Sequence, residues 1–243
     1  SYLMRSSPII LLSAMISSSS CGLTAETLEA DVCVYAATPS GILAAIAVKR
    51  EGRSVIIVEP SRWVGGILGA GIKPQQDCPN PRATGGLTRT LITTLGQPDG
   101  QPNKYDSKQL TPAAIREDFR RLLEQHEIRV VFEHRVSRCE VKDHAVTEAW
   151  FDLARFDALG CPPAEAEKKE NLCVKARIFI DASYEGDLMP RSGIRYRVGR
   201  ESAEEFKEEF GGVRAPVHIT PMDPFVERGN PKSGLLKWVE ADH

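Results

Sequence analysis

The chain has 243 residues, of which 42% are hydrophobic and 26% charged, a balance that is ordinary for a globular protein with a buried core. Its 31 basic and 33 acidic residues leave a net charge of −2, and neither sign forms a sustained run. A nucleic-acid-binding protein would carry a basic patch, so that class of partner is not expected. The length suits one large domain, or one domain and part of another.

The first 25 residues differ in composition from the rest of the chain. Arg5 is followed by an apolar stretch over residues 8–16, a run of serines and the small residue Ala25. A charged start, a short apolar segment and a small residue at the end are typical of a secretory signal peptide. We therefore interpret residues 4–25 as a signal peptide and expect a secreted or periplasmic protein. A buried N-terminal strand or helix is the alternative, and the apolar stretch is too short to span a membrane.

The cysteines do not indicate a metal site. None of the six lies in a CxxC pair, and no histidine stands beside them at a metal-ligand spacing. Cys161 and Cys173 flank a polar segment and could form a disulfide in an oxidising compartment. The sequence leaves this pairing open, because a disulfide also requires a suitable distance between the two backbones.

The clearest structural pattern lies between residues 31 and 59. Residues 31–36 form a short apolar run typical of a buried parallel strand. A turn over residues 37–41 leads into a predicted helix over residues 42–50, which ends before Gly52, and a second strand follows over residues 54–59. Strand, helix and strand form a βαβ unit, whose right-handed crossover makes the two strands parallel and adjacent.

The rest of the chain predicts further helices and strands around this unit. Residues 65–87 are rich in glycine and are interpreted as a loop. Helices are predicted over residues 88–95 and from a cap at Thr111 with Pro112 in the first turn, and strands over residues 128–132, 136–141, 146–151 and 174–180. Residues 154–171 are charged and contain two adjacent prolines, which indicates a solvated insertion. The pattern predicts an α/β fold: a Rossmann-like parallel sheet with an inserted antiparallel β segment over residues 136–151.

A modified dinucleotide-binding motif lies in the βαβ unit. The three glycine positions of Gly-x-Gly-x-x-Gly are occupied by Ala36, Thr38 and Gly41. Gly41 allows the helix and strand to approach closely, and the two small residues let the backbone come near a pyrophosphate at the helix N-terminus. Glu59 ends the second strand, where a carboxylate can accept hydrogen bonds from ribose hydroxyls. Taken alone, the motif is equally consistent with a turn that needs small residues for packing.

The residues after Glu59 favour a flavoprotein. The segment continues as Pro60-Ser61-Arg62-Trp63-Val64-Gly65-Gly66. A carboxylate followed by Arg-x-x-Gly-Gly is the continuation found in flavoproteins with two dinucleotide-binding domains, and it argues against a dehydrogenase that uses only a nicotinamide cofactor.

Further motifs make a family resemblance specific. They are Asp31 to Gly41, Glu59 to Gly66, Gly85-Gly86-Leu87-Thr88-Arg89, Phe179-Ile-Asp-Ala-Ser-Tyr-Glu-Gly-Asp-Leu-Met189, Tyr196-x-Val-Gly-Arg-Glu201 and Ser233-Gly234-Leu235-Leu236. In this order they span nearly all of the chain after the signal segment. The chain resembles the FAD-dependent oxidoreductases of bacterial secretomes.

The resemblance implies FAD as cofactor and assigns it a set of contacts. The pyrophosphate would be surrounded by the segment Ala36, Thr38, Pro39, Ser40 and Gly41, and the adenosine ribose held by Glu59. Pro60, Arg62, Gly65 and Gly66 would follow the cofactor, and the backbone of Val136 would meet the adenine. Asp181, Ala182 and Ser183 would line the cofactor, with Asp187 at the start of the next helix, where its acid could instead only complement the helix dipole.

Two departures from the family pattern stand out. Position 36, often glycine in the family, is alanine here. Family members also continue into a complete substrate domain, so we interpret residues 28–198 as the FAD-binding domain and residues 199–243 as the start of a truncated substrate domain that is open to proteolysis.

The resemblance predicts an FAD-dependent oxidoreductase acting on a small organic substrate. A non-catalytic flavoprotein fragment and an NAD-dependent dehydrogenase are the alternatives. The catalytic residues remain unknown: Asp77 and the histidines at positions 126, 134, 144 and 218 are candidates by residue type alone.

Overall fold

The computed structural model describes residues 25–71, 83–95, 111–199, 201–208, 211–212, 223 and 225–236. Residues 4–24 of the expected signal peptide lie outside the described residues, as do Asp77 and His218.

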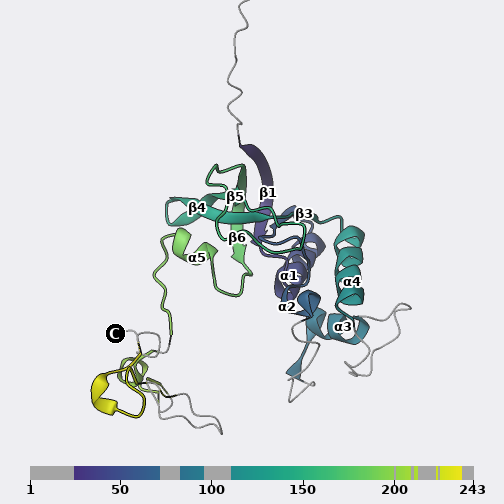
Figure 1. Ribbon diagram of the computed structural model, residues 1–243. Coiled ribbons are helices and arrows are strands. Elements are labelled where there is room, and N and C mark those ends of the chain that lie inside the picture. Colours follow the sequence, from purple (N-terminus) through teal and green to yellow (C-terminus); the bar gives the residue numbers. More distant parts are fainter. Residues whose placement is uncertain are drawn as a thin grey trace, which may run out of the picture.

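A single six-stranded sheet forms the centre of the molecule (Figure 1). Its strands are β1 (Glu26–Tyr35), β2 (Val55–Val58), β3 (Arg129–Val131), β4 (His134–Lys142), β5 (Ala145–Leu153) and β6 (Leu172–Asp181), in the spatial order β3-β2-β1-β6-β5-β4. The pairs β2–β3, β1–β2 and β1–β6 are parallel, whereas β4–β5 and β5–β6 are antiparallel. The predicted fold class is therefore confirmed, including the inserted antiparallel segment.

The helices are α1 (Pro39–Arg50), α2 (Gly66–Ala70), α3 (Gly86–Thr94), α4 (Pro112–Gln125), α5 (Leu188–Arg191) and α6 (Ala203–Phe206), with a 3-10 turn η3 at Pro231–Ser233. Helices α1 to α4 lie beside the parallel half of the sheet, whereas α5 lies against β4 of the antiparallel half (Figure 1). The predicted cap at Thr111 is confirmed, because its side chain accepts a hydrogen bond from the Ala114 N–H at 3.2 Å. Helix α1 begins three residues earlier than predicted, since Thr38 is its N-cap and Pro39 occupies the first turn.

The prediction of a continuous loop over residues 65–87 was wrong at both ends of the segment. Helix α2 occupies residues 66–70, and α3 already begins at Gly86. Gly65 and Gly71, with φ of 89° and 77°, bound α2 on either side. A helix of five residues is too short for a hydrophobic period to be recognised in the sequence.

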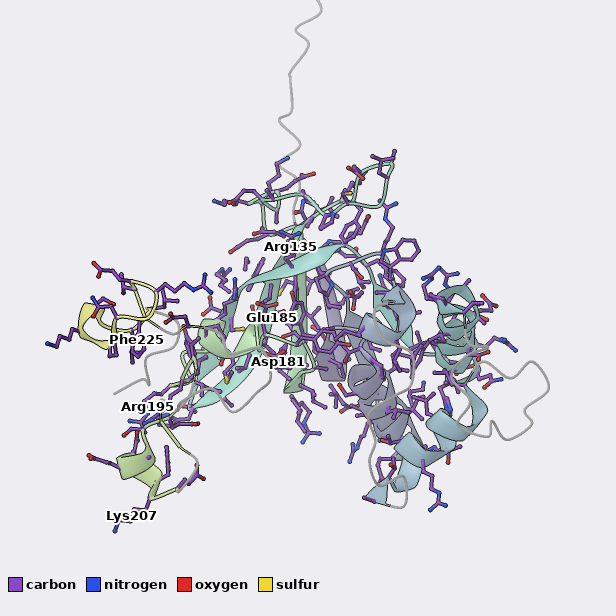
Figure 2. The ribbon with its side chains drawn as sticks, turned by 60° about the horizontal axis from the view of Figure 1, so that its bottom comes forward. Arg135, Asp181, Glu185, Arg195, Lys207 and Phe225 are labelled. Atoms are coloured by element: carbon purple, nitrogen blue, oxygen red, sulfur yellow. The ribbon has the colours of Figure 1, made fainter. Side chains whose placement is uncertain are left out.

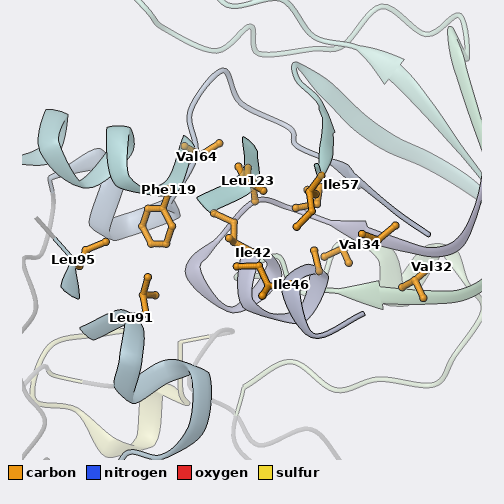
Figure 3. Packing of buried hydrophobic residues seen from close by; sticks show 14 of the residues in the cluster. Val32, Val34, Ile42, Ile46, Ile57, Val64, Leu91, Leu95, Phe119 and Leu123 are labelled. Carbon is orange, nitrogen blue, oxygen red and sulfur yellow. The ribbon is translucent and has the colours of Figure 1, made fainter. Parts of the chain in front are cut away.

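Two hydrophobic clusters lie on opposite faces of the sheet. Side chains alternate along β1, so Val34 belongs to the cluster beneath α1 and Tyr35 to the cluster on the other face. In the first cluster, Ile42 of α1 and Phe119 of α4 are fully buried (Figure 3). Phe151 of β5 packs against Tyr35 in the second, with ring centroids 5.9 Å apart. Strand β1 is thus buried on both faces, which explains its continuous apolar run.

The insertion over residues 154–171 contains no helix or strand. Cys161 is exposed, Cys173 is buried and both are free thiols, so the disulfide considered from the sequence is not formed. Within the described residues, no helix is long and apolar enough to cross a membrane, and no group of potential metal ligands comes together.

Candidate functional site

The strand order places a topological switch point between β1 and β6. Helix α1 connects β1 to β2 on one side of β1, whereas β6 lies on the other side. Tyr35 at the end of β1 is paired with Asp181 at the end of β6, so the loops that follow both strands start at the same edge of the sheet. In open α/β sheets, ligands bind outside the carboxyl ends of the strands at such a point.

The loop from Ala36 to Gly41 begins at this switch point. Ala36 has a φ of 78°, a left-handed conformation that glycine adopts without strain, which accounts for the glycine usual at this position of the motif. The Thr38 hydroxyl accepts the Gly41 N–H at 3.2 Å and donates to the Ala182 carbonyl at 2.9 Å. Ser40 Oγ lies 3.0 Å from Thr38 Oγ1. The only proton of Thr38 is therefore used within the protein, and Thr38 ties the β1 loop to the β6 loop.

Gly41 is required by the close approach of α1 to the loop. A Cβ atom at this position would lie 2.2 Å from the Ala36 carbonyl oxygen and 3.0 Å from the Ala182 Cβ. The first turn of α1 also has backbone N–H groups that no carbonyl of the helix can satisfy. A small-residue loop at a helix N-terminus suits a phosphate group, so the geometry fits the pyrophosphate of a dinucleotide.

The Glu59 carboxylate is buried beside this loop, with 6% of the residue exposed. One oxygen accepts the Ala37 N–H at 2.5 Å, and the other accepts the Ser61 N–H at 2.8 Å and the Ser61 hydroxyl at 2.5 Å. A carboxylate has about four acceptor positions, so one on the Ala37-facing oxygen remains for a further donor. This arrangement fits a ribose hydroxyl.

Burial determines the titration of Glu59. Desolvation raises the pKa of its carboxyl group above the ordinary value of 4.5, and the hydrogen bonds from Ser61 and Ala37 partly oppose that rise. These donors converge on the carboxylate and favour its charged form.

Arg62 is directed away from the switch point. Its guanidinium donates to the carbonyls of Phe156 and Asp157 at 2.7 and 3.0 Å and to Glu133 Oε1 at 3.3 Å. It also lies over the Phe156 ring, 5.3 Å from the centroid. In this structure Arg62 joins the segment after β2 to the insertion, and a role beside the cofactor stays a prediction.

The two glycines, Gly65 and Gly66, each contact one loop of the switch point. The Gly65 N–H donates to the Ala37 carbonyl at 2.8 Å, and Gly65 is buried against the Phe119 ring. Gly66 lies against the hydroxyl of Tyr184. Pro60 is half-buried between Glu59 and Ser61.

The β6 loop is organised by Asp181 (Figure 2). One of its carboxylate oxygens accepts the N–H and hydroxyl of Ser183, and the other accepts the N–H groups of Leu188 and Met189 at the start of α5. Asp187 occupies the N-cap position but makes no side-chain capping bond. Asp181 thus performs the capping, and the loop holds Ala182 against Thr38.

Val136 of β4 is buried in the second cluster. Its N–H donates to the Tyr35 hydroxyl at 3.3 Å, so this backbone donor already has a partner within the protein. Burial raises the pKa of Tyr35, which keeps the hydroxyl protonated. A contact between the Val136 backbone and adenine stays a prediction.

Sequence reasoning missed two residues of this site. Ser61 donates twice to Glu59, and its position two residues after a strand-end glutamate is a signal that could have been recognised. Tyr184 reaches Ile67, 117 positions earlier in the chain, and no local pattern indicates that contact.

Comparison with known proteins identifies the family. The family model described as FAD dependent oxidoreductase matches residues 31–237. None of the curated protein sequences matches the chain significantly.

Several solved structures are similar to part of this chain at low sequence identity. They include the flavin-dependent brominase Bmp2 (15% identity, 72% of this chain and 42% of that chain, TM-score 0.46). A geranylgeranyl bacteriochlorophyll reductase-like protein from Thermoplasma acidophilum has 15% identity, with 70% of this chain and 43% of that chain covered and a TM-score of 0.42. The bacillithiol disulfide reductase Bdr from Staphylococcus aureus has 13% identity, with 64% and 38% covered and a TM-score of 0.38.

The chain spans less than half the length of these three proteins, and similarity at this level says nothing of its substrate. The family match, by contrast, covers most of the chain and includes both loops of the switch point. The chain belongs to the FAD dependent oxidoreductase family.

Proposed function

We propose that the protein binds FAD at the β1–β6 switch point and oxidises or reduces a small organic substrate. The observation that carries the proposal is the convergence of Glu59 and the loop from Ala36 to Gly41, joined directly by the hydrogen bond from the Ala37 N–H to Glu59. In this proposal Glu59 accepts from the adenosine ribose and the N-terminus of α1 binds the pyrophosphate, and FAD contains both groups.

The residues of the chain would bind and orient the cofactor. The N-terminus of α1 would meet the pyrophosphate, and the remaining acceptor position of Glu59 would take a ribose hydroxyl. The flavin supplies the hydride chemistry when bound, while the protein provides orientation and electrostatics.

No described histidine is assigned to proton transfer. His126 ends α4, His144 lies in the turn between β4 and β5, and His134 Nδ1 lies 2.7 Å from the Phe132 carbonyl. The proposal therefore concerns the cofactor and the reaction class, and the substrate is left as a small organic molecule.

The purified protein should contain FAD. The site offers a phosphate-binding loop and a ribose acceptor, and FMN has no adenosine ribose to occupy the second. Mass spectrometry of the released cofactor tests this, with the absorbance spectrum of the protein as an independent check. Release of FMN or NAD, or no uptake of added FAD, would contradict the proposal.

Redox cycling tests whether the bound flavin can carry hydride chemistry. Photoreduction of the FAD-loaded protein, followed by exposure to oxygen or a quinone, should show bleaching and recovery of the flavin absorbance. A cofactor that binds but does not cycle would favour the non-catalytic module.

We also propose that the protein is exported, on the basis of the charged, apolar and small-residue segments before residue 26. Expression in a bacterial host should yield mature protein outside the cytoplasm with a new N-terminus close to Ala25. N-terminal sequencing measures the cleavage point, and replacing three leucines or isoleucines of residues 8–16 with aspartate should keep the protein uncleaved. Cytoplasmic protein that retains residues 1–25 would contradict export.

A further inference from the structure

Three hydrogen bonds join the loops after β1, β2 and β6 into a closed ring. The Gly65 N–H donates to the Ala37 carbonyl at 2.8 Å, the Ile67 N–H donates to the Tyr184 hydroxyl at 2.8 Å, and the Thr38 hydroxyl donates to the Ala182 carbonyl at 2.9 Å. The chain itself connects these residues in pairs, so the loops after β1, β2 and β6 form one closed circuit, here called the hydrogen-bond ring. Strand β1 lies between β2 and β6, so the ring lies at the carboxyl end of β1.

Tyr184 differs from the other members of the hydrogen-bond ring. Thr38 and Gly65 are buried, whereas Tyr184 is 55% exposed. Its oxygen is fixed by the Ile67 N–H, and among the residues that the structure describes none accepts its hydroxyl proton. A phenol hydroxyl has one proton to donate, so an oriented donor is available at the rim of the site.

Gly66 leaves the space that this hydroxyl occupies. It has a φ of 49°, and a Cβ atom there would lie 2.3 Å from the Tyr184 hydroxyl oxygen. The absence of a side chain at position 66 therefore allows Tyr184 to approach the backbone and complete the hydrogen-bond ring.

We infer that Tyr184 is a cofactor-binding residue that closes the β1–β6 switch point and donates its hydroxyl proton to an oxygen of the FAD segment between its adenosine and its flavin. This inference rests on the proposed function. Thr38 cannot serve as that donor without breaking its bond to Ala182, whereas Tyr184 can donate while it still accepts from Ile67. Because the Tyr184 side chain closes the switch point in this inference, it also slows the release of FAD.

Tyr184→Phe tests the inference, because it removes the hydroxyl and leaves the half-exposed ring. We expect FAD to bind about tenfold more weakly, mainly through faster dissociation, in calorimetric titration and stopped-flow flavin fluorescence. The thermal unfolding temperature of the cofactor-free protein should change little, since an exposed hydrogen bond contributes little. Tyr196→Phe is the matched control, because Tyr196 is 48% exposed and outside the hydrogen-bond ring, and it should bind FAD as the wild type does.

Gly66→Ala gives an independent test through the same hydroxyl. Its Cβ should displace the Tyr184 hydroxyl and weaken FAD binding, but it should add little in the Tyr184→Phe background. Wild-type protein that fails to bind FAD would overturn the proposed function itself. Wild-type protein that binds FAD while Tyr184→Phe stays within twofold of it, or weakens no more than Tyr196→Phe, would overturn the inference alone.

Discussion

Glu59→Gln is expected to lower the affinity for FAD ten- to a hundredfold. The carboxylate holds the Ala37 N–H and both donors of Ser61, and one acceptor position remains for a ribose hydroxyl. Hydrogen bonds to a charged group contribute about 1.5–3 kcal/mol, and each 1.4 kcal/mol changes affinity tenfold. A glutamine side chain has one oxygen and places an amide NH2 group where the second carboxylate oxygen accepts, so either Ala37 or Ser61 faces a donor.

Two control variants isolate the role of the carboxylate. Asp152 is likewise a buried carboxylate, and it accepts the N–H groups of Lys169 and Glu170 away from the switch point, so Asp152→Asn should lower stability without changing FAD affinity. Ser61→Ala removes one donor from Glu59 and keeps its remaining acceptor, so its affinity should stay within about threefold. Calorimetric titration measures the FAD dissociation constant of all three variants. An unchanged dissociation constant for Glu59→Gln would mean that the ribose is held elsewhere.

Glu59 should also leave a signature in the pH dependence of stability. Its folded-state pKa is raised above 4.5 by burial, so the folded protein binds the proton more tightly than the unfolded chain does. Protonation of Glu59 therefore stabilises the folded state. This contribution to the free energy of unfolding is fully present below the unfolded-state pKa and is lost as the pH rises through the folded-state pKa. Urea unfolding of the cofactor-free protein across this window should show that decrease in the wild type and a smaller one in Glu59→Gln.

The fold could be predicted because its signals are local. The apolar run of β1, the helix that follows it and the spacing to Glu59 all lie within about 30 residues, the size of a βαβ unit. The start of that helix was predicted three residues too late, because the Thr38 cap was not recognised. Family membership followed from motifs in their order along the chain. The positions of Gly41 and Glu59 at one edge of the sheet then follow from the parallel pairing of β1 and β2.

Long-range contacts could not be predicted in the same way. The partners of Arg62 are Glu133, between β3 and β4, and the carbonyls of residues 156–157, inside an insertion that has no periodic pattern. The contact between Tyr184 and Ile67 depends on the order β2-β1-β6, which brings two distant loops together across β1. Such contacts are set by the three-dimensional arrangement. A sequence motif therefore predicts the position of a residue in the fold but not its long-range contacts.

Gly41→Ala is expected to lower the free energy of unfolding by about 2–3 kcal/mol, in the upper range for inserting a methyl group into a tightly packed site. The new Cβ would lie 2.2 Å from the Ala36 carbonyl oxygen, and because that atom belongs to the backbone it cannot move without shifting the loop. The shift would carry Ala37 away from Glu59, so FAD should also bind more than tenfold more weakly. Urea unfolding and calorimetric titration at a temperature where the variant is still folded measure the two effects.

Gly52→Ala is the matched control for this variant. Gly52 follows the same helix and has a φ of 69°, but a Cβ there would have no atom within 4 Å. Gly52→Ala should therefore lower the free energy of unfolding by about 1 kcal/mol, because only the left-handed backbone disfavours alanine there. The variant should leave the FAD affinity unchanged. At Gly41 the backbone is not left-handed, so any loss beyond that control comes from contact with the loop. Equal stability losses for the two variants, or a Gly41→Ala protein with wild-type FAD affinity, would show that the loop after β1 tolerates displacement and does not bind the pyrophosphate.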